Sequence, residues 1–437
     1  MYNICERFFD EGMYKSMKKY LLALGAVAAM MVPQVAGAEG FAINEWSAEG
    51  VAMGGARMFA ENDAASVAYN PASITKVKGE ALKNSVTYLS PHGEYDLYKN
   101  NANIEAGKNV VHPGWAGSTF YVKQVNDKDW FGIGAFSRFA MVSEFERKSI
   151  ASNNAFFSRL NGVSLTPTYA HKFDDKWSAA VGAEINYAGL ELQKNINSGK
   201  LGTTQIKGES YALGWNAAAN YTFDDKNEMG VVYRSRITHS LEADLKGYNI
   251  CGKVDTFGNA YGVVTLPDSW SIGYNHKFDD KTRVELNATR TNWSTYDALN
   301  ISLSDLTVPV LSNSINANKN WESGCSINAN KNWESGWRYA IGLEHKVSDK
   351  YTLMAGYAFD EGCIPYDGGD FMVPTGDRKT YSIGARYNDD KQTVAIALGW
   401  MDVGSLSFKG GAFDGYDHAN THDSFTKIAS ISYQRSF

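Results

Sequence analysis

Apolar and polar residues alternate along most of this chain, and the alternation stops repeatedly at short polar segments. Between 270 and 278 large or aromatic residues stand at the even positions, with Ser271, Gly273 and Asn275 between them. The same alternation returns between 393 and 400. A period of two predicts β-strands, because successive side chains of a strand point to opposite faces.

The polar stops are rich in Asp and Asn. These residues favour tight turns because their side chains hydrogen-bond to nearby backbone and tolerate left-handed geometry. The six stops are NDKD at 126–129, FDDK at 173–176, 223–226 and 278–281, VSDK at 347–350 and NDDK at 388–391. Six hairpins give twelve strands, and alternating segments at 84–90 and 424–437 bring the predicted number to fourteen.

Longer polar segments join the strands at their other ends. These segments are 91–114, 142–162, 190–209, 239–268, 296–334, 361–379 and 402–423. Short turns on one side, long connections on the other and an even number of strands are typical of an outer-membrane barrel. Closure pairs the backbone groups that an open edge would leave unsatisfied in hydrocarbon. We therefore predict an all-β fold, a 14-stranded antiparallel transmembrane β-barrel.

Composition agrees with many strands and tells against several other classes. Aromatic residues make up 13% of the 437 residues, and there are 41 Gly against 9 Pro. A net charge of -6 gives no reason to expect nucleic acid. The sequence lacks HExxH, GxSxG and phosphate-loop motifs, so no enzyme is predicted. A secreted β-sandwich is the alternative fold, but its connections are rarely so unequal in length.

The two ends of the chain carry further signals. Lys18 and Lys19 precede a short apolar run from Tyr20 to Val32, and the small residues Ala36-Gly37-Ala38 follow it as a cleavage site. This pattern predicts a signal peptide over 1–38, with Met17 as the suspected true start. The terminal Phe437 is the kind of residue that outer-membrane barrels present to their assembly machinery. The mature chain is expected to be a monomer in outer-membrane lipid.

Residues 39–83 do not alternate and are rich in Ala and Gly. The segment is too small for a good core of its own, so we predict that it plugs the lumen of a barrel formed by 84–437. Its sequence GFAINEWSAEGVAMGGARMFAENDAASVAYNPASIT, which ends in Asn70-Pro71-Ala72 and Ser73 to Thr75, resembles the N-terminal hatch of the FadL/TodX family. These proteins are outer-membrane transporters of long-chain fatty acids and other hydrophobic compounds.

The resemblance implies passive, gated diffusion of a hydrophobic ligand, with no cofactor and no metal. It implies capture by an apolar loop surface at Phe156-Phe157 and a pocket floored by Phe41 and Ile43. A shift of the hatch or of the third strand would then release the ligand. In that strand Arg138-Phe139-Ala140 replaces the family's Pro-Phe-Gly, which weakens the expectation of a kink.

Strand parity places several charges on the lumen side. A carboxylate in a low-dielectric pocket needs a cation to offset its desolvation. The candidate ligand residues are Arg138, with Phe136 and Phe139 beside it, and Arg234, Arg338 and Arg386; Arg236 shares the parity of Arg234. The alternative, favoured for any single arginine, is that it pairs with an inward carboxylate and holds the plug.

Other readings remain open. The barrel could be a structural or adhesive protein that binds a partner through its long loops, or a hydrophilic porin. A cluster of Asp414, Asp417, His418, His422 and Asp423 could bind a divalent ion, although a solvated loop is the favoured interpretation.

Two features lie outside these functions. Three cysteines follow the signal segment, Cys251, Cys325 and Cys363, and a disulfide among them is left open. The sequence SINANKNWESG occurs at 314–324 and again at 326–336. We expect the first copy to lengthen an outer loop and the second to belong to the tenth strand.

Overall fold

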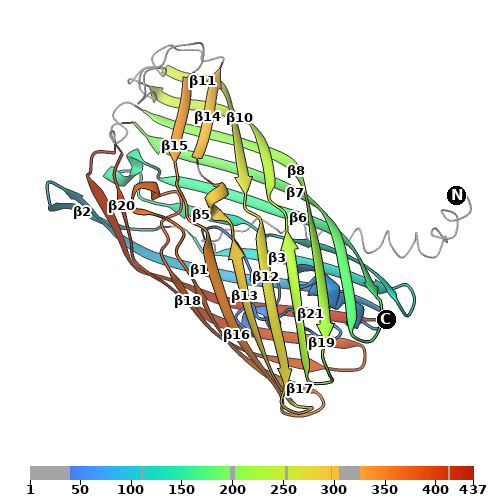
Figure 1. Ribbon diagram of the computed structural model, residues 1–437. Coiled ribbons are helices and arrows are strands. Elements are labelled where there is room, and N and C mark those ends of the chain that lie inside the picture. Colours follow the sequence, from blue (N-terminus) through green and yellow to red (C-terminus); the bar gives the residue numbers. More distant parts are fainter. Residues whose placement is uncertain are drawn as a thin grey trace, which may run out of the picture.

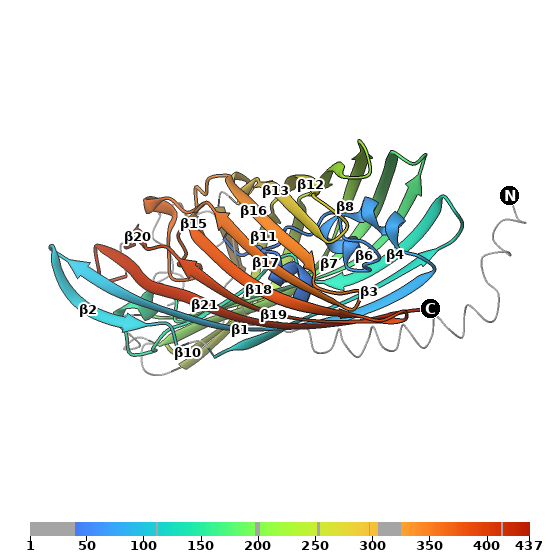
Figure 2. The ribbon, with the colours of Figure 1, turned by 90° about the horizontal axis from the view of Figure 1, so that it is seen from below.

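A computed structural model of the protein describes residues 40–110, 112–196, 202–250, 254–296, 298–304, 325–411 and 414–437. Its strands form an elongated cylinder with short helices inside (Figures 1 and 2). The predicted signal segment and the first copy of the duplicated sequence lie outside the described residues.

Fourteen strands pair in succession around the barrel, all antiparallel, and the last pairs with the first. In ring order they are β1 (Glu80–Lys99), β3 (Gly114–Gln124), β4 (Asp129–Phe136), β6 (Phe157–Lys172), β7 (Trp177–Asn195), β8 (Thr203–Thr222), β9 (Asn227–Arg234), β12 (Ser269–Lys277), β13 (Thr282–Thr291), β16 (Gly336–Lys346), β17 (Tyr351–Asp360), β18 (Arg378–Asn388), β19 (Gln392–Val403) and β21 (His418–Ser436). The pairing of β1 with β21 closes the ring. The predicted strand number is confirmed.

All six acidic stops are tight turns between consecutive strands at one end of the barrel. The turn at Asp279 shows the cause. Its Oδ1 accepts hydrogen bonds from the backbone N–H groups of Lys281 at 2.8 Å and Thr282 at 2.6 Å. Asp174 and Asp224 accept equivalent pairs of bonds. These N–H donors stabilise the charged carboxylate and hold the pKa of all three Asp residues below the usual value.

Replacing Asp279 with Ala is expected to speed hydrogen exchange at the Lys281 and Thr282 amides, because both lose their acceptor. The pKa of the Asp279 carboxyl is lower in the folded protein than in the unfolded chain. Its contribution to the stability of the turn is therefore present at neutral pH and disappears as the pH falls through the folded pKa. The difference between variant and wild type should therefore vanish in acid. Asp280→Ala, one residue along, is the control, and an equal effect there would contradict the assignment.

The connections at the opposite end are mostly strand, where the sequence predicted polar loops. The additional strands are β2 (Ala102–Lys108), β5 (Ala140–Glu144), β10 (Ile237–Ile250), β11 (Val254–Leu266), β14 (Ala298–Ser304), β15 (Cys325–Asn330) and β20 (Leu406–Lys409). Short 3-10 helices η3 (Ile150–Asn153), η4 (Trp293–Thr295) and η5 (Tyr366–Gly368) lie between them. The extension of paired strands beyond the barrel wall forms a tall outer rim, seen around β11, β14 and β15 in Figure 1.

The polarity of the two faces inverts along these strands, and β7 shows it clearly. In the half of β7 nearer the tight turns, Val181 and Ile185 face outward at 60% and 43% exposure, while Glu184 and Asn186 are buried inside the barrel. Further up, Leu190 and Leu192 take the inward positions and pack against an apolar cluster. The outward face meets lipid along the barrel wall and water along the outer rim. The apolar residues therefore face outward in the wall and inward in the rim.

The second copy of the duplicated sequence does not form the tenth barrel strand. Its first residues form β15, which pairs with β14 in the outer rim, whereas β16 begins only at Gly336. The expectation was wrong because strands also pair with one another in the outer rim, above the barrel wall, so a strand can form there without belonging to the wall.

The segment 40–79, here called the hatch, lies before β1 and inside the barrel (Figure 2). It contains α3 (Ala48–Ala52), α4 (Ser66–Tyr69) and η2 (Pro71–Lys76). Ser47 caps α3, as its Oγ accepts the Gly50 N–H at 3.0 Å. Asn70 caps η2 by accepting the Ala72 N–H and also donates to Asn220 of β8 at 2.7 Å. The motif Asn70-Pro71-Ala72 thus joins the hatch to the wall.

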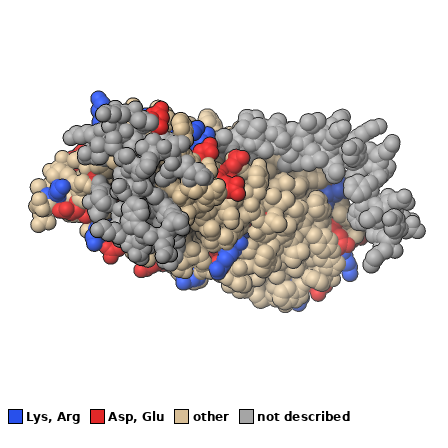
Figure 3. Space-filling view, turned by 90° about the horizontal axis from the view of Figure 1, so that it is seen from above, with Lys and Arg blue, Asp and Glu red and all other residues tan. Residues whose placement is uncertain are grey.

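The outer wall is apolar. Leu213, Tyr211 and Ile383 expose 77%, 72% and 62% of their surface on it, and Lys, Arg, Asp and Glu are sparse over the broad tan area of Figure 3. No helix within the described ranges is long and apolar enough to cross a membrane.

Candidate functional site

A buried ionic network fastens the hatch to the barrel wall. Glu344 of β16 accepts from Arg57 of the hatch at 2.8 Å, from Arg283 at 2.9 Å and from Arg386 at 2.6 Å. Arg57 also contacts Asp63 at 3.0 Å. Lys83 of β1 contacts Glu49 and Asp63 at 2.7 and 2.8 Å, and Glu285 accepts from Arg283 and from hatch N–H groups. The network holds four carboxylates and four cations, so its charges balance.

The hatch N-terminus crosses a break in the third strand of the barrel. β4 ends at Phe136 and β5 begins at Ala140, and the three residues between them face two on β6, residues 162 and 163. The Ile43 N–H donates to the Arg138 carbonyl at 2.8 Å, and the Ala140 N–H donates to the Phe41 carbonyl at 3.0 Å. The break therefore exists without proline or glycine at 138–140, against the weakened expectation from the sequence.

Glycine on the neighbouring strand makes room for this break. A Cβ on Gly162 of β6 would lie 2.5 Å from the Phe139 carbonyl oxygen. A larger residue there would push the broken segment away, because real Cβ atoms do not approach so closely.

A polar cavity lies between the hatch and the wall strands β9, β12 and β13. It leaves about 70 Å³ free for water-sized molecules and is lined by Ile43, Trp46, Arg138, Phe139 and Arg234, among others. Arg138 pairs with Glu184 at 2.8 Å. Arg234, 6% exposed, donates to the Ala68 carbonyl, and its Nη1 is buried without a partner among the described residues. The cavity wall thus carries one positive charge more than this carboxylate neutralises.

An apolar pocket lies on the other side of the strand break. It leaves about 20 Å³ free for a water-sized molecule, and its lining consists of Phe41, Met141, Leu160, Ala188, Leu190, Leu192, His239, Leu241, Val264, Leu266, Tyr296 and Met372. The Phe41 ring packs against Trp293 at 4.7 Å, Tyr296 at 5.5 Å and Phe139 at 6.0 Å between centroids. Phe41 faces this pocket and Phe139 faces the polar cavity, so the ring pair separates the two spaces.

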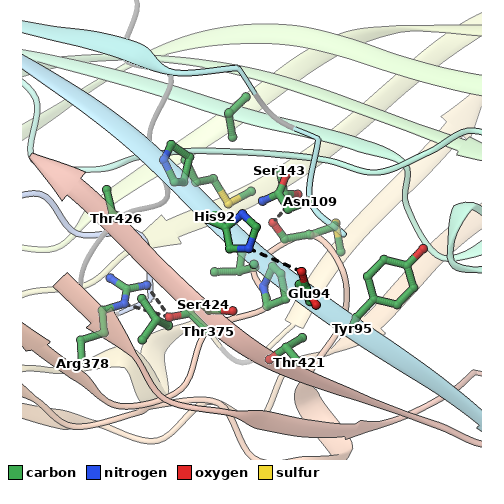
Figure 4. Close-up of a pocket in the computed structure, with 18 of the residues that line it drawn as sticks. His92, Glu94, Tyr95, Asn109, Ser143, Thr375, Arg378, Thr421, Ser424 and Thr426 are labelled. Atoms are coloured by element: carbon green, nitrogen blue, oxygen red, sulfur yellow. Dashed lines mark hydrogen bonds and ion pairs between the residues drawn. The ribbon is translucent and has the colours of Figure 1, made fainter. Parts of the chain in front are cut away.

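A mouth pocket, with about 60 Å³ free for water-sized molecules, lies beside β1 and β21 in the outer half of the barrel (Figure 4). Met141 and Met372 line both this pocket and the apolar pocket, so the two adjoin. Arg378 lines its floor, donating to Thr375 Oγ1 at 2.8 Å and to the Gly40 carbonyl at 3.2 Å. The hatch N-terminus therefore lies where the mouth pocket, the apolar pocket and the polar cavity meet.

The structure distributes the other predicted site residues in different ways. Arg338 pairs with Asp360 at 2.8 Å and donates to the Gly54 carbonyl, and Arg386 belongs to the network around Glu344. These two arginines hold the hatch, as the alternative interpretation proposed. Phe136 is buried behind Trp46, at 5.2 Å between ring centroids, and lines none of the three pockets.

Two expectations about exposure are wrong. Phe156 is 1% exposed under the Arg147 guanidinium, 4.8 Å away, so it offers no capture surface, while Phe157 is half-buried. The loop that carries Phe156 folds back into the outer rim, where burial of the Phe156 ring is favourable. Arg236 does not share the lumen with Arg234, because the strand is interrupted between the end of β9 and the start of β10. The Arg236 side chain is 58% exposed and lies beside Asp268.

Sequence reasoning missed much of the pocket lining. The missed residues are Met141, Leu160, Leu190, Leu192, His239, Leu241, Val264, Leu266, Tyr296, Met372 and Arg378 in the lining, and Trp293 and Trp333, which pack against Phe41. Most lie in segments interpreted as polar loops. Their signal was the run of apolar residues at alternate positions within those segments.

The acidic and histidine residues at 414–423, weighed above as an alternative metal site, are not assembled as a unit. Within the described part of the chain, Glu94, His422 and Asp423 bring ligand atoms within 4.8 Å of one another. Asp414 instead contacts Asn154 at 3.0 Å, and His418 stacks on Tyr98 at 4.7 Å. The structure therefore separates residues that the sequence placed together.

Known proteins are similar to this chain over both its hatch and its barrel. The sequence profile of the family described as outer membrane protein transport protein (OMPP1/FadL/TodX) matches residues 29–419. The chain belongs to this family. As a member of the OMPP1/FadL/TodX family, it is an outer-membrane protein, in agreement with its apolar outer wall.

Relatives of the chain match over nearly their whole length. The long-chain fatty acid transport protein of Escherichia coli O6:H1 is 23% identical over 432 residues, covering 88% of this chain and 92% of the relative. The crystal structure of a Pseudomonas aeruginosa FadL homologue superposes with a TM-score of 0.78 at 18% identity, covering 91% of this chain and 100% of that one. The Pseudomonas putida toluene transporter TodX gives 0.68 at 16% identity, with 90% and 99% coverage. The two structures show that the fold is shared.

Proposed function

We propose that this barrel carries hydrophobic compounds across the outer membrane by passive, gated diffusion, and that long-chain fatty acids are its main cargo. Family membership supports transport, and the names of relatives point to fatty acids and to toluene. The observation that carries the fatty-acid assignment is Arg234, a buried guanidinium with an unpartnered Nη1 beside the polar cavity. No catalytic step, cofactor or metal enters the proposal.

The alkyl chain of the cargo is assigned to the apolar pocket, whose lining side chains must move apart to admit it because only about 20 Å³ is free there. Burying each CH₂ group there contributes about 0.8 kcal/mol, so a long chain gains more than a short one. The mouth pocket, which adjoins it through Met141 and Met372, is the entry from the outer side.

The carboxylate of the cargo is assigned to the polar cavity, against Arg234. A carboxylate moved out of water needs a charge-assisted partner to offset its desolvation. Arg138 already has Glu184, whereas Arg234 hydrogen-bonds to backbone carbonyls and lies over the rings of Trp46 and Phe136, with no carboxylate partner among the described residues. The cargo must cross the Phe41–Phe139 ring pair to reach it, and a shift of the hatch or of the broken third strand would open that route.

The other candidate functions receive less support. A hydrophilic porin needs an open lumen, but the hatch here is fastened by the balanced network around Glu344. Adhesion through outer loops is disfavoured because much of the outer rim is paired strand. Insertion by the barrel assembly machinery and a monomeric state stay predictions.

Arg234→Gln is expected to weaken palmitate binding about 10- to 100-fold, the loss of a hydrogen bond to a charged group. Binding of hexadecane should be unchanged, since it has no carboxylate. Isothermal titration of the purified barrel in detergent measures both, and Arg236→Gln is the matched control because that side chain is 58% exposed. Unchanged palmitate affinity in Arg234→Gln would contradict the carboxylate site.

Lipid extraction and mass spectrometry of the protein from its native membrane test the cargo class directly. Fatty acids should be enriched over their abundance in the surrounding membrane. Recovery of aromatic hydrocarbons without fatty acids would keep the transport function and reject the fatty-acid assignment.

A further inference from the structure

His239 of β10 introduces an unpartnered polar nitrogen into the wall of the apolar pocket. The residue is 1% exposed and lines the pocket, whose other lining side chains are apolar except for the Tyr296 hydroxyl. Its Nδ1 is buried and has no hydrogen-bond partner among the described residues. A buried polar atom without a partner is costly, so a ligand that supplies one gains affinity.

A chain of hydrogen bonds fixes which ring nitrogen carries the proton. Glu184 accepts from Arg138 through Oε2, at 2.8 Å, and from Ser164 Oγ through Oε1, at 2.6 Å. The Ser164 oxygen must then accept from Asn186 Nδ2, at 2.8 Å. This orientation turns Asn186 Oδ1 toward His239 Nε2, 2.9 Å away.

Nε2 of His239 is therefore a donor, because Asn186 Oδ1 can only accept. In the neutral imidazole the other nitrogen, Nδ1, then has no proton and is an acceptor. The pocket thus offers a hydrogen-bond acceptor in apolar surroundings, held in one tautomer by a relay that begins at the Arg138–Glu184 pair.

We propose that His239 Nδ1 accepts a hydrogen bond from a hydroxyl group of the cargo, so that among apolar chains of similar size the apolar pocket prefers those that carry an O–H donor. Fatty alcohols, hydroxylated fatty acids and phenols belong to this class, whereas hydrocarbons, ethers and esters do not. The inference rests on the proposed function in one respect, namely that the apolar pocket holds cargo.

The experiment compares two ligands of similar size and apolar character, decanol and decyl methyl ether. The preference is the ratio of their dissociation constants for the purified full-length barrel in detergent. We expect the ratio to favour decanol about tenfold more in wild type than in His239→Leu, the equivalent of 1.4 kcal/mol. The ether should still bind His239→Leu, since leucine keeps the pocket apolar.

A control and a second readout guard against a folding defect. His345→Leu, at an exposed position on β16 near the turn side, should keep the wild-type ratio. In the wild-type protein, NMR of isotope-labelled histidine should show Nδ1 unprotonated without ligand. Its signal should shift when decanol is added and stay in place when the ether is added.

Each outcome decides the proposal. An equal ratio in wild type and His239→Leu overturns it, and so does a protonated Nδ1 in the empty protein. If both compounds bind wild type without preference, only this inference fails and transport of hydrophobic compounds stands. If neither compound binds wild type, the proposed function fails as well.

Discussion

Replacing Glu344 with Gln is expected to detach the hatch from the barrel wall and to open an ion-conducting lumen. Three guanidinium groups converge on this carboxylate, from Arg57, Arg283 and Arg386. Glutamine keeps the shape of the side chain but removes the charge. Breaking a buried ion pair by neutralising one partner costs about 3–5 kcal/mol, because the other charge stays buried and uncompensated.

The effect is expected to be large because the network is balanced. Its members are the carboxylates Glu49, Asp63, Glu285 and Glu344 and the cations Arg57, Lys83, Arg283 and Arg386. Loss of one negative charge leaves a net positive charge in the lumen. Water entering around the hatch would relieve it, so hydration and displacement of the hatch are favoured together.

Single-channel recording in a planar bilayer measures the result. Wild type should pass little current, and Glu344→Gln should show frequent openings of porin-like size. Glu334→Gln is the control, because Glu334 is exposed in the segment before β16. If Glu344→Gln stays as closed as wild type while remaining folded in the membrane, the network does not hold the hatch.

The sequence was sufficient for the wall of the barrel, because two local signals coincide there. Period-two alternation marks each strand, and side chains such as Asp279 bond to their own turn backbone within three residues. Neither signal depends on distant parts of the chain. The number of strands could therefore be predicted from local patterns.

The outer rim could not be predicted in the same way, because alternation there has the opposite sense. Leu190 and Leu192 face inward on the same parity as Glu184 and Asn186 lower down β7. A pattern that requires apolar residues on the lipid side ends where the lipid ends. For this reason the residues that line the apolar pocket were assigned to polar loops.

The arginines show where inference about the site stopped. Parity alone placed Arg138, Arg234, Arg338 and Arg386 on the lumen side, but it could not tell a paired arginine from an unpaired one. Arg57 reaches Glu344 across 287 positions of sequence, and such pairs depend on how the hatch seats in the barrel. The strand break at 137–139 was equally hidden, since the space for it comes from Gly162 on the next strand.

Replacing Phe41 with Ala is expected to merge the apolar pocket with the polar cavity and to speed release of bound cargo. The ring contacts Trp293, Tyr296, Trp333 and Phe139 with centroids 4.7–6.0 Å apart. Truncating a buried Phe to Ala costs about 3–5 kcal/mol where the site cannot collapse. The Ala140 N–H donates to the carbonyl of residue 41, and without its ring residue 41 would no longer be held in place by side-chain packing. The third strand should therefore open more often at its break.

Two measurements on the same preparation test this expectation. Hydrogen exchange at the Ala140 amide should accelerate by tenfold or more, and stopped-flow release of a fluorescent fatty acid should become faster by a similar factor. Phe120→Ala is the matched control, because Phe120 is equally buried but packs in a different cluster, beside Phe136. A general loss of packing would affect both variants alike, whereas a gate formed by Phe41 and Phe139 requires release to accelerate in Phe41→Ala alone.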